Sequence, residues 1–171
     1  AGVQPGERVV VFGCGGVGLS AVQVAVARGA SVMAVDPNRA AHEVAASMGS
    51  ADVAVGVAAD VSDEGAVARG LEAAVLAYGG VDLVVNNAGL SISKPLAETT
   101  EADWDLQHDV MAKGSFLVSR EAAKVMGAQG MGGDIVYISS KNSLFAGPNN
   151  IAYGATKADQ AHQVRLLAAE L

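Results

Sequence analysis

The sequence predicts an α/β fold in which helices cover both faces of a parallel sheet of about five strands. Short β-branched runs alternate with longer Ala-rich stretches over 171 residues, a pattern typical of repeated strand–helix units. Apolar residues make up 51% of the chain and aromatic residues only 4%, so Val, Ala, Leu and Ile must form the core. The first apolar run does not alternate with polar residues, as expected for a strand buried on both faces.

Each element has its own signals. A glycine turn ends the first strand, Gly29 ends the helix that follows, and Gly79-Gly80 ends the third helix. Ser62 can cap that third helix, which has acidic residues in its first turn. We predict strands at Arg8–Phe12, Ser31–Val35, Asp52–Ala58, Val81–Val85 and Ile135–Ser139. We predict helices at Val17–Arg28, Arg39–Met48, Asp63–Tyr78, Glu101–Met126 (after Pro95 and Thr99-Thr100) and Asn150–Leu171.

Five such units predict a doubly wound, three-layer α/β/α sheet with the strand order 3-2-1-4-5. No Pro- and Gly-rich linker divides the chain, and it contains no low-complexity segment or clear short-period repeat. We therefore expect residues 1–171 to form a single Rossmann-type domain. In sheets of this kind, ligands bind at the carboxyl ends of the strands.

The composition argues against several classes of protein. The net charge is −7 and no run of Lys or Arg occurs, which argues against binding to nucleic acid. Cys14 is the only cysteine, and no Cys/His cluster has the spacing of a metal site, so we expect neither an internal disulfide nor a metal. We find no secretory apolar region at the start and no apolar run of eighteen residues. These features predict a soluble, cytoplasmic protein without membrane contact.

A glycine-rich pattern follows the first predicted strand. Gly13, Gly15 and Gly18 fit G-x-G-x-x-G between a strand and a helix. Gly13 permits the tight turn, Gly15 lets a pyrophosphate approach the backbone, and Gly18 lets helix and strand pack closely. Free N–H groups at the helix start, at Gly16 and Val17, can receive phosphate charge. The pattern predicts a dinucleotide site, and the alternative is a glycine-rich turn that binds no ligand.

An acidic residue accompanies this turn. Asp36 ends the second predicted strand, where its carboxylate can accept hydrogen bonds from the ribose hydroxyls of an adenosine. The same charge would repel the extra phosphate of NADP, so the sequence favours NAD as the cofactor. The alternative is that Asp36 is a solvated cap before Pro37. The small Cys14 within the turn is expected to fill space.

A second group of residues predicts proton transfer. Tyr153 and Lys157 are four residues apart on one face of the last predicted helix, and Ser140 ends the fifth strand. A free phenol has a pKa near 10, and a neighbouring ammonium stabilises its charged form. The Ser140 hydroxyl could hold a substrate oxygen while hydride moves at carbon. The alternative is a buried tyrosine, a surface lysine and a serine that ends a strand.

The two halves of the chain resemble two families. Residues 1 to about 57 resemble the cofactor domain of medium-chain, zinc-type alcohol dehydrogenases, on the segments Ala1–Glu7, Val9–Gly13, Gly15–Gly18 and Val35-Asp36. The catalytic domain of those enzymes has no counterpart here, so their chemistry is not implied. Residues from about 58 to 171 resemble the short-chain dehydrogenases/reductases, on Asp60-Val61, Asn86-Asn87-Ala88-Gly89, Ser140, Tyr153 and Lys157.

The second resemblance implies roles for individual residues. Asp60 and Val61 would contact adenine, and Asn87, Ala88 and Gly89 would line the cofactor site. Ser140 would support the substrate oxygen, Tyr153 would act as acid and base, and Lys157 would bind ribose and activate the phenol. Residues 134–171 resemble especially the dehydrogenase domain of bifunctional rhamnulose-phosphate aldolase/alcohol dehydrogenase proteins, which implies small hydroxyaldehydes as substrates.

Three departures from the short-chain pattern shape the functional hypothesis. The family's own glycine turn is replaced by the medium-chain form, its long-helix Asn falls at Met111, and its segment beyond the equivalent of Leu171 is not found. We therefore expect an engineered-looking chimera with a seam between residues 51 and 60, NAD-binding and with alcohol/carbonyl oxidoreductase chemistry. The alternative is a catalytically inert scaffold. In the short-chain family the corresponding helices pack between subunits, so the resemblance implies a homodimer, and the alternative is burial of the last helix against this chain's own sheet. Small residues on that helix would permit close contact: Ala152, Ala155, Ala158 and Ala161.

Overall fold

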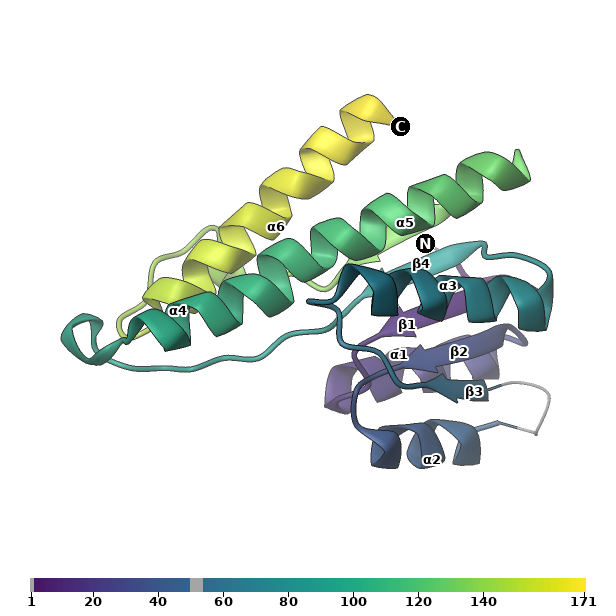
Figure 1. The fold of residues 1–171 in the computed structure, drawn as a ribbon, viewed down its shortest axis with the longest axis horizontal. Helices are drawn as coiled ribbons and strands as arrows, with labels where there is room; N and C mark the ends of the chain where they lie inside the picture. The colour runs from purple at the N-terminus through teal and green to yellow at the C-terminus, as the bar shows by residue number, and fades with distance from the viewer. Residues whose placement is uncertain (1, 50–53) are drawn as a thin grey trace.

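The computed structural model describes residues 2–49 and 54–171. Its five parallel strands are ordered β3-β2-β1-β4-β5, which confirms the predicted doubly wound α/β sheet (Figure 1). Asp52 and Val53 of the predicted third strand, and residues 51–53 of the predicted seam, lie outside the described residues. The strands are β1 (Arg8–Phe12), β2 (Ser31–Val35), β3 (Ala54–Val57), β4 (Leu83–Asn86) and β5 (Asp134–Tyr137).

All five strands end in register. Phe12, the last residue of β1, pairs with Val35 of β2 on one side and with Asn86 of β4 on the other. Val35 pairs in turn with Val57, and Asn86 with Tyr137. Each of these residues is the last in its strand. The loops that follow the strands therefore leave the sheet from one common edge.

Two helices cover each face of the sheet. Helices α1 (Gly16–Ala27) and α2 (Arg39–Ser47) pack on one face, and α3 (Glu64–Tyr78) and α5 (Gly114–Gln129) pack on the other. The first core includes the buried residues Val9, Val11, Val22, Ala25, Val32, Ala34 and Ala45. The second core includes Val10, Phe12, Met33, Val35, Val67, Leu71, Leu117 and Val118. Successive strand residues enter opposite cores, as the strand repeat requires.

The ends of α3 show one correct and one wrong expectation. Gly79 ends the helix in the left-handed conformation with φ of 78°, as the sequence predicts. Ser62 is not the cap, because its backbone N–H and its hydroxyl donate to Asp60 Oδ1, both at 2.8 Å. Asp63 caps instead, and its Oδ1 accepts from the backbone N–H of Ala66 at 2.8 Å. Because Ser62 is bonded to the carboxylate of Asp60, α3 begins at Glu64, one residue later than the sequence predicts.

The long helix predicted over 101–126 is interrupted. A capping box between Thr100 and Asp103 starts α4 (Glu101–Gln107), but residues His108–Lys113 form a π-helical segment before α5 begins. We call His108–Lys113 the π segment. In a π turn the backbone carbonyls depart from the α-helical i→i+4 hydrogen-bond pattern. Side chains supply donors at two of these carbonyls: Ser115 and Gln160 bond to Met111 O, and Gln163 bonds to Ala112 O.

The last helix, α6 (Ile151–Glu170), supplies two of these donors. It contacts α4 and the π segment, and Figure 1 shows it separating from α5 toward its C-terminal end. Short 3₁₀ turns occur at Leu96–Glu98 and Lys141–Ser143. Within residues 2–49 and 54–171, no helix combines the length and the apolar character that crossing a membrane requires.

The packing of the glycine turn can be tested by two single substitutions. A Cβ at Gly18 would collide with the carbonyl oxygen of Gly13, whereas a Cβ at Gly16 would meet no atom within 4 Å. We expect Gly18→Ala to lower the free energy of unfolding by about 2 kcal/mol or more. Gly16→Ala should leave it unchanged or raise it by up to about 1 kcal/mol. Urea unfolding followed by circular dichroism measures both, and equal effects would contradict this packing.

Candidate functional site

A cavity of about 630 Å³ lies at the common edge where the strands end, a volume typical of small-molecule sites. The loops after β1, β2, β3, β4 and β5 and the start of α6 all contribute to its wall. Most of the residues singled out in the sequence line it: Gly13, Gly15, Gly16, Val17, Asp36, Asp60, Val61, Asn87, Ala88, Gly89, Tyr153 and Lys157. The early glycine turn and the late tyrosine and lysine therefore open onto one cavity.

Gly13 is the junction of three loops. Its backbone N–H donates to Val35 O at 2.8 Å, and its carbonyl oxygen accepts from Asn87 Nδ2 at 2.7 Å. Its φ of 90° lies in the region that favours glycine. A Cβ here would also collide with the backbone of Ala88. A larger residue at this position would push the loops after β1 and β4 apart.

At the start of α1, glycine backbone rather than side chains forms the cavity wall. Gly15 is the N-cap residue and, because it has no side chain, it supplies no side-chain capping hydrogen bond. A Cβ built at Gly15 or at Gly16 would meet no atom within 4 Å, and both residues line the cavity. The first N–H groups of a helix have no acceptor within the helix. This end of the cavity therefore offers backbone donors and open space, which suits an anionic group. Gly18 does not line the cavity but packs beneath it on Gly13.

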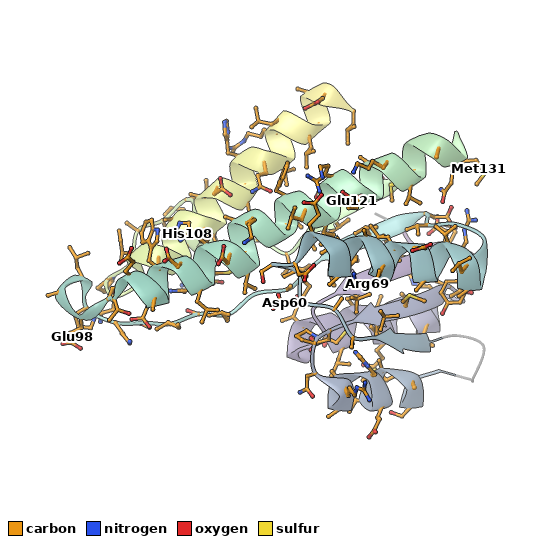
Figure 2. The ribbon with its side chains drawn as sticks, viewed as in Figure 1. Asp60, Arg69, Glu98, His108, Glu121 and Met131 are labelled. Atoms are coloured by element: carbon orange, nitrogen blue, oxygen red, sulfur yellow. The ribbon has the colours of Figure 1, made fainter. Side chains whose placement is uncertain are left out.

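Two carboxylates line the same end of the cavity. Asp36 Oδ2 accepts from the backbone N–H of Cys14 at 2.7 Å, and its Oδ1 accepts from that of Asn38 at 2.8 Å. Asp36 is half-buried, and these two bonds fix its orientation against the glycine turn. Asp60 is exposed, and Figure 2 shows it on the loop that leads into α3. Neither residue is paired with a cation by an ion pair among the described residues.

The opposite end of the cavity holds Tyr153 and Lys157. Both lie in the first two turns of α6, and Lys157 Nζ is 5.8 Å from the centroid of the Tyr153 ring. Lys157 is only 5% exposed, and burial lowers the pKa of its ammonium. Nζ donates to Ile138 O at 2.8 Å and to Gln160 Oε1 at 2.9 Å. The ammonium is therefore held between the end of β5 and its own helix.

Ser140 is not brought to the cavity wall. Of the described residues near the end of β5, Ile138 and Ser139 line the cavity. Ser140 has an extended backbone and starts a 3₁₀ turn, in which its Oγ accepts from the backbone N–H of Asn142 at 3.2 Å. The substrate-oxygen role expected of Ser140 thus stays a prediction.

Two further residues lie beside this pair: Met111, which the sequence analysis noted as a departure from the family pattern, and Gln160, which it missed. Met111 is fully buried in the π segment and lines the cavity, at the position where the resemblance leads one to expect Asn. Gln160 is 1% exposed and contacts Lys157 directly. Its position three residues after Lys157 on one helix is a signal that could have found it.

Comparisons with known proteins cover nearly the whole chain. The sequence profile of the family described as short chain dehydrogenase matches residues 7–171. The uncharacterized oxidoreductase YuxG of Bacillus subtilis is 42% identical over 166 residues, which are 95% of this chain and 24% of that protein. The NADP-dependent (R)-specific alcohol dehydrogenase of Lentilactobacillus kefiri is 33% identical over 150 residues, 87% of this chain and 60% of that protein.

Solved structures agree with the sequence comparisons. The crystal structure of a putative short-chain dehydrogenase/reductase from Burkholderia xenovorans has a TM-score of 0.92 and 30% identity, and covers 99% of this chain and 70% of that chain. The chain spans less than two thirds of both curated relatives. The family match runs without a break through residues 51–60, so it gives no support to a medium-chain segment, a chimera or a seam. The special link to bifunctional aldolase/dehydrogenase proteins is likewise not supported.

The burial of Cys14 within the glycine turn predicts a slow reaction of its thiol. Cys14 is 2% exposed, and burial together with the charge of Asp36 raises the pKa of its thiol to about 12. At pH 8 only about one thiol in ten thousand would then be ionised, and the thiolate is the reactive form. We expect dithionitrobenzoate to react with Cys14 at least a hundredfold more slowly in the folded protein than in urea. Equal rates in the two states would contradict this description of the turn.

Proposed function

The chain belongs to the short chain dehydrogenase family, and from this premise we propose that it binds NAD(H) and interconverts a small alcohol and its aldehyde or ketone. One observation carries the proposal. A single cavity has backbone donors without side chains beside the end of β1 and the Tyr153–Lys157 pair beside the end of β5. Such a cavity can hold an extended anionic cofactor and a proton-transfer group side by side.

The residues present fit a dinucleotide. The open space over Gly15 and Gly16 and the free N–H groups of α1 suit a pyrophosphate. Asp36 would accept hydrogen bonds from the adenosine ribose, Asp60 and Val61 would contact adenine, and Asn87, Ala88 and Gly89 would line the middle of the site. Lys157 would bind the second ribose. A bound nicotinamide ring would accept or supply the hydride.

The choice of NAD over NADP rests on Asp36. Its carboxylate lines the cavity and is held by the N–H groups of Cys14 and Asn38. A 2′-phosphate on the ribose would bring two further negative charges toward this carboxylate, and like charges at short range repel. One relative is named as NADP-dependent, so cofactor preference must be measured on this chain.

The Tyr153–Lys157 pair accounts for the proton transfer in the proposed reaction. When a carbonyl is reduced, hydride adds to its carbon and the Tyr153 hydroxyl donates a proton to its oxygen. In the oxidation the alcohol loses its proton to Tyr153 as hydride leaves the carbon. The ammonium of Lys157 beside the ring stabilises negative charge on the phenol oxygen. Ser140 is proposed to hold the substrate oxygen, which requires its hydroxyl to turn from Asn142 toward the cavity.

The cavity and the surface of α6 also bear on the substrate and on assembly. The cavity must hold cofactor and substrate together in about 630 Å³, which favours a small alcohol, aldehyde or hydroxyaldehyde. A homodimer through α6 is proposed because Ala158 is exposed on that helix and Ala155 and Ala161 are half-exposed. A catalytically inert scaffold would share the fold but would bind no cofactor. Measurements of cofactor binding and of turnover therefore distinguish such a scaffold from the proposed oxidoreductase.

Cofactor preference can be tested by Asp36→Ala. We expect the Kd for NADH to rise about tenfold or more, because a hydrogen bond to a charged acceptor contributes roughly 1.5–3 kcal/mol. The Kd for NADPH should rise less or fall. The measurement is calorimetric titration with each cofactor, and the ratio of the two Kd values cancels any general distortion of the turn. An unchanged ratio would contradict the role of Asp36.

Turnover can be tested by Tyr153→Phe. With NADH and a panel of small aldehydes and hydroxyaldehydes, we expect reduction to slow by about a hundredfold or more, the usual worth of a positioned acid. Tyr137→Phe is the matched control, because the Tyr137 hydroxyl contacts Ser119 of α5 and Gln163 of α6 and does not line the cavity. NADH oxidation is followed by absorbance. Equal rates for parent and Tyr153→Phe, at or above background, would remove the enzymatic proposal.

A further inference from the structure

Gln160 is a buried amide in direct contact with the site lysine. It is 1% exposed on α6, one turn beyond Lys157, and its Oε1 accepts a hydrogen bond from Lys157 Nζ at 2.9 Å. The other acceptor of this ammonium is the backbone carbonyl of Ile138. Gln160 therefore supplies the one side-chain acceptor for Lys157 among the contacts of the described residues.

The other end of the Gln160 amide is anchored to the π segment. Nε2 donates to Met111 O at 3.0 Å and to Ser115 Oγ at 2.5 Å, and that hydroxyl donates to Met111 O at 2.6 Å. The Met111 carbonyl lies in the irregular π segment and accepts from both side chains as well as from the backbone N–H of Gly114. The irregular backbone of the long helix thus provides the anchor for a side chain on another helix.

These contacts fix which way the amide points. If the amide were flipped, its NH2 group would face the ammonium of Lys157 and its oxygen would face the carbonyl of Met111. Two donors would then oppose each other at one end and two acceptors at the other. A buried group that loses its partners is strongly destabilised, so only one orientation satisfies the network. In that orientation the amide oxygen faces the ammonium.

We propose that Gln160 is a positioning residue for Lys157: it ties the ammonium to the π segment and holds it in place beside Tyr153. This inference rests on the proposed function, because it deepens the role of Lys157 there. The position at which the family resemblance leads one to expect Asn is occupied by Met111, whose side chain offers no amide. An amide from α6 reaches the backbone of the same residue and connects it to the lysine.

The surroundings of Lys157 make its charge sensitive to this contact. Tyr153 contacts the ammonium from the same helix, and Asp36 and Asp60 line the same cavity. The π segment contributes Val110 and Met111, which are apolar, and the end of β5 contributes Ile138 and Ser139. Burial already lowers the pKa of Lys157. An acceptor bonded to the ammonium opposes this effect, so removing it should lower the pKa further.

A matched pair of variants isolates the contact. Gln160→Met keeps the length of the side chain but removes both the acceptor for Lys157 and the donor to Met111 and Ser115. Gln163→Met removes a bond of the same kind, because Gln163 Nε2 donates to Ala112 O of the π segment at 2.9 Å without touching Lys157. Gln160→Glu retains an acceptor oxygen for the ammonium. Thermal unfolding of each variant verifies that it is folded.

The primary measurement is the titration of Lys157 in cofactor-free protein, by NMR of lysine labelled with 13C at Cε. The Lys157 signal is assigned by its loss in Lys157→Met. We expect the midpoint in Gln160→Met to lie about one pH unit below that of the parent, the size expected for a lost bond to a charged group. The midpoint in Gln163→Met should match the parent, and that in Gln160→Glu should be at or above the parent value.

The outcomes separate this inference from the proposed function. Equal midpoints in the parent and Gln160→Met, or equal shifts in Gln160→Met and Gln163→Met, would overturn it. If the parent binds no NADH, the proposed function fails, whereas the titration still decides the role of Gln160. In an active protein, the alkaline limb of the pH–rate profile should move down in Gln160→Met by the same amount, and an unmoved limb would overturn the proposal.

Discussion

The register of the sheet is the constraint on which the site depends. The last residues of all five strands form one row, from Val57 through Val35, Phe12 and Asn86 to Tyr137. A parallel sheet with this register delivers every following loop to the same edge. Segments far apart in the sequence, from the glycine turn to the start of α6, therefore share one cavity. A slip of one residue in a strand would turn its side chains to the opposite face and would displace its loop.

Hydrogen bonds between loops then convert a common edge into a defined site. Gly13 bonds to Val35 O and accepts from the amide of Asn87, while Asp36 bonds to Cys14 N. At the other end, the ammonium of Lys157 is buried and paired with neutral acceptors rather than a carboxylate. Neutral partners leave its positive charge available to a neighbouring phenol, whereas a salt bridge would neutralise it. The π segment contributes by presenting the Met111 carbonyl to Gln160.

Much of this arrangement follows from local sequence. The strands and most helices could be predicted because their apolar runs and glycine stops are local signals, and the strand order follows from the alternation of strands and helices. The π segment could not, because two of its carbonyls accept from the side chains of Gln160 and Gln163, about fifty residues away. The choice of Asp63 over Ser62 as a cap depended on Asp60. The comparisons support the short-chain family and give the medium-chain segment no support, and a glycine turn describes a phosphate-binding geometry that does not by itself identify a family. The residues lining the cavity were mostly identified from motifs, whereas Gln160 carries no motif.

The most direct test of the central claim is a crystal structure of the protein grown or soaked with NAD at millimolar concentration. The account predicts one dinucleotide across the edge of the sheet, with its pyrophosphate over Gly15 and Gly16 and its nicotinamide ring beside Tyr153 and Lys157. A dinucleotide bound elsewhere, or a cavity that stays empty at saturating NAD, would contradict it.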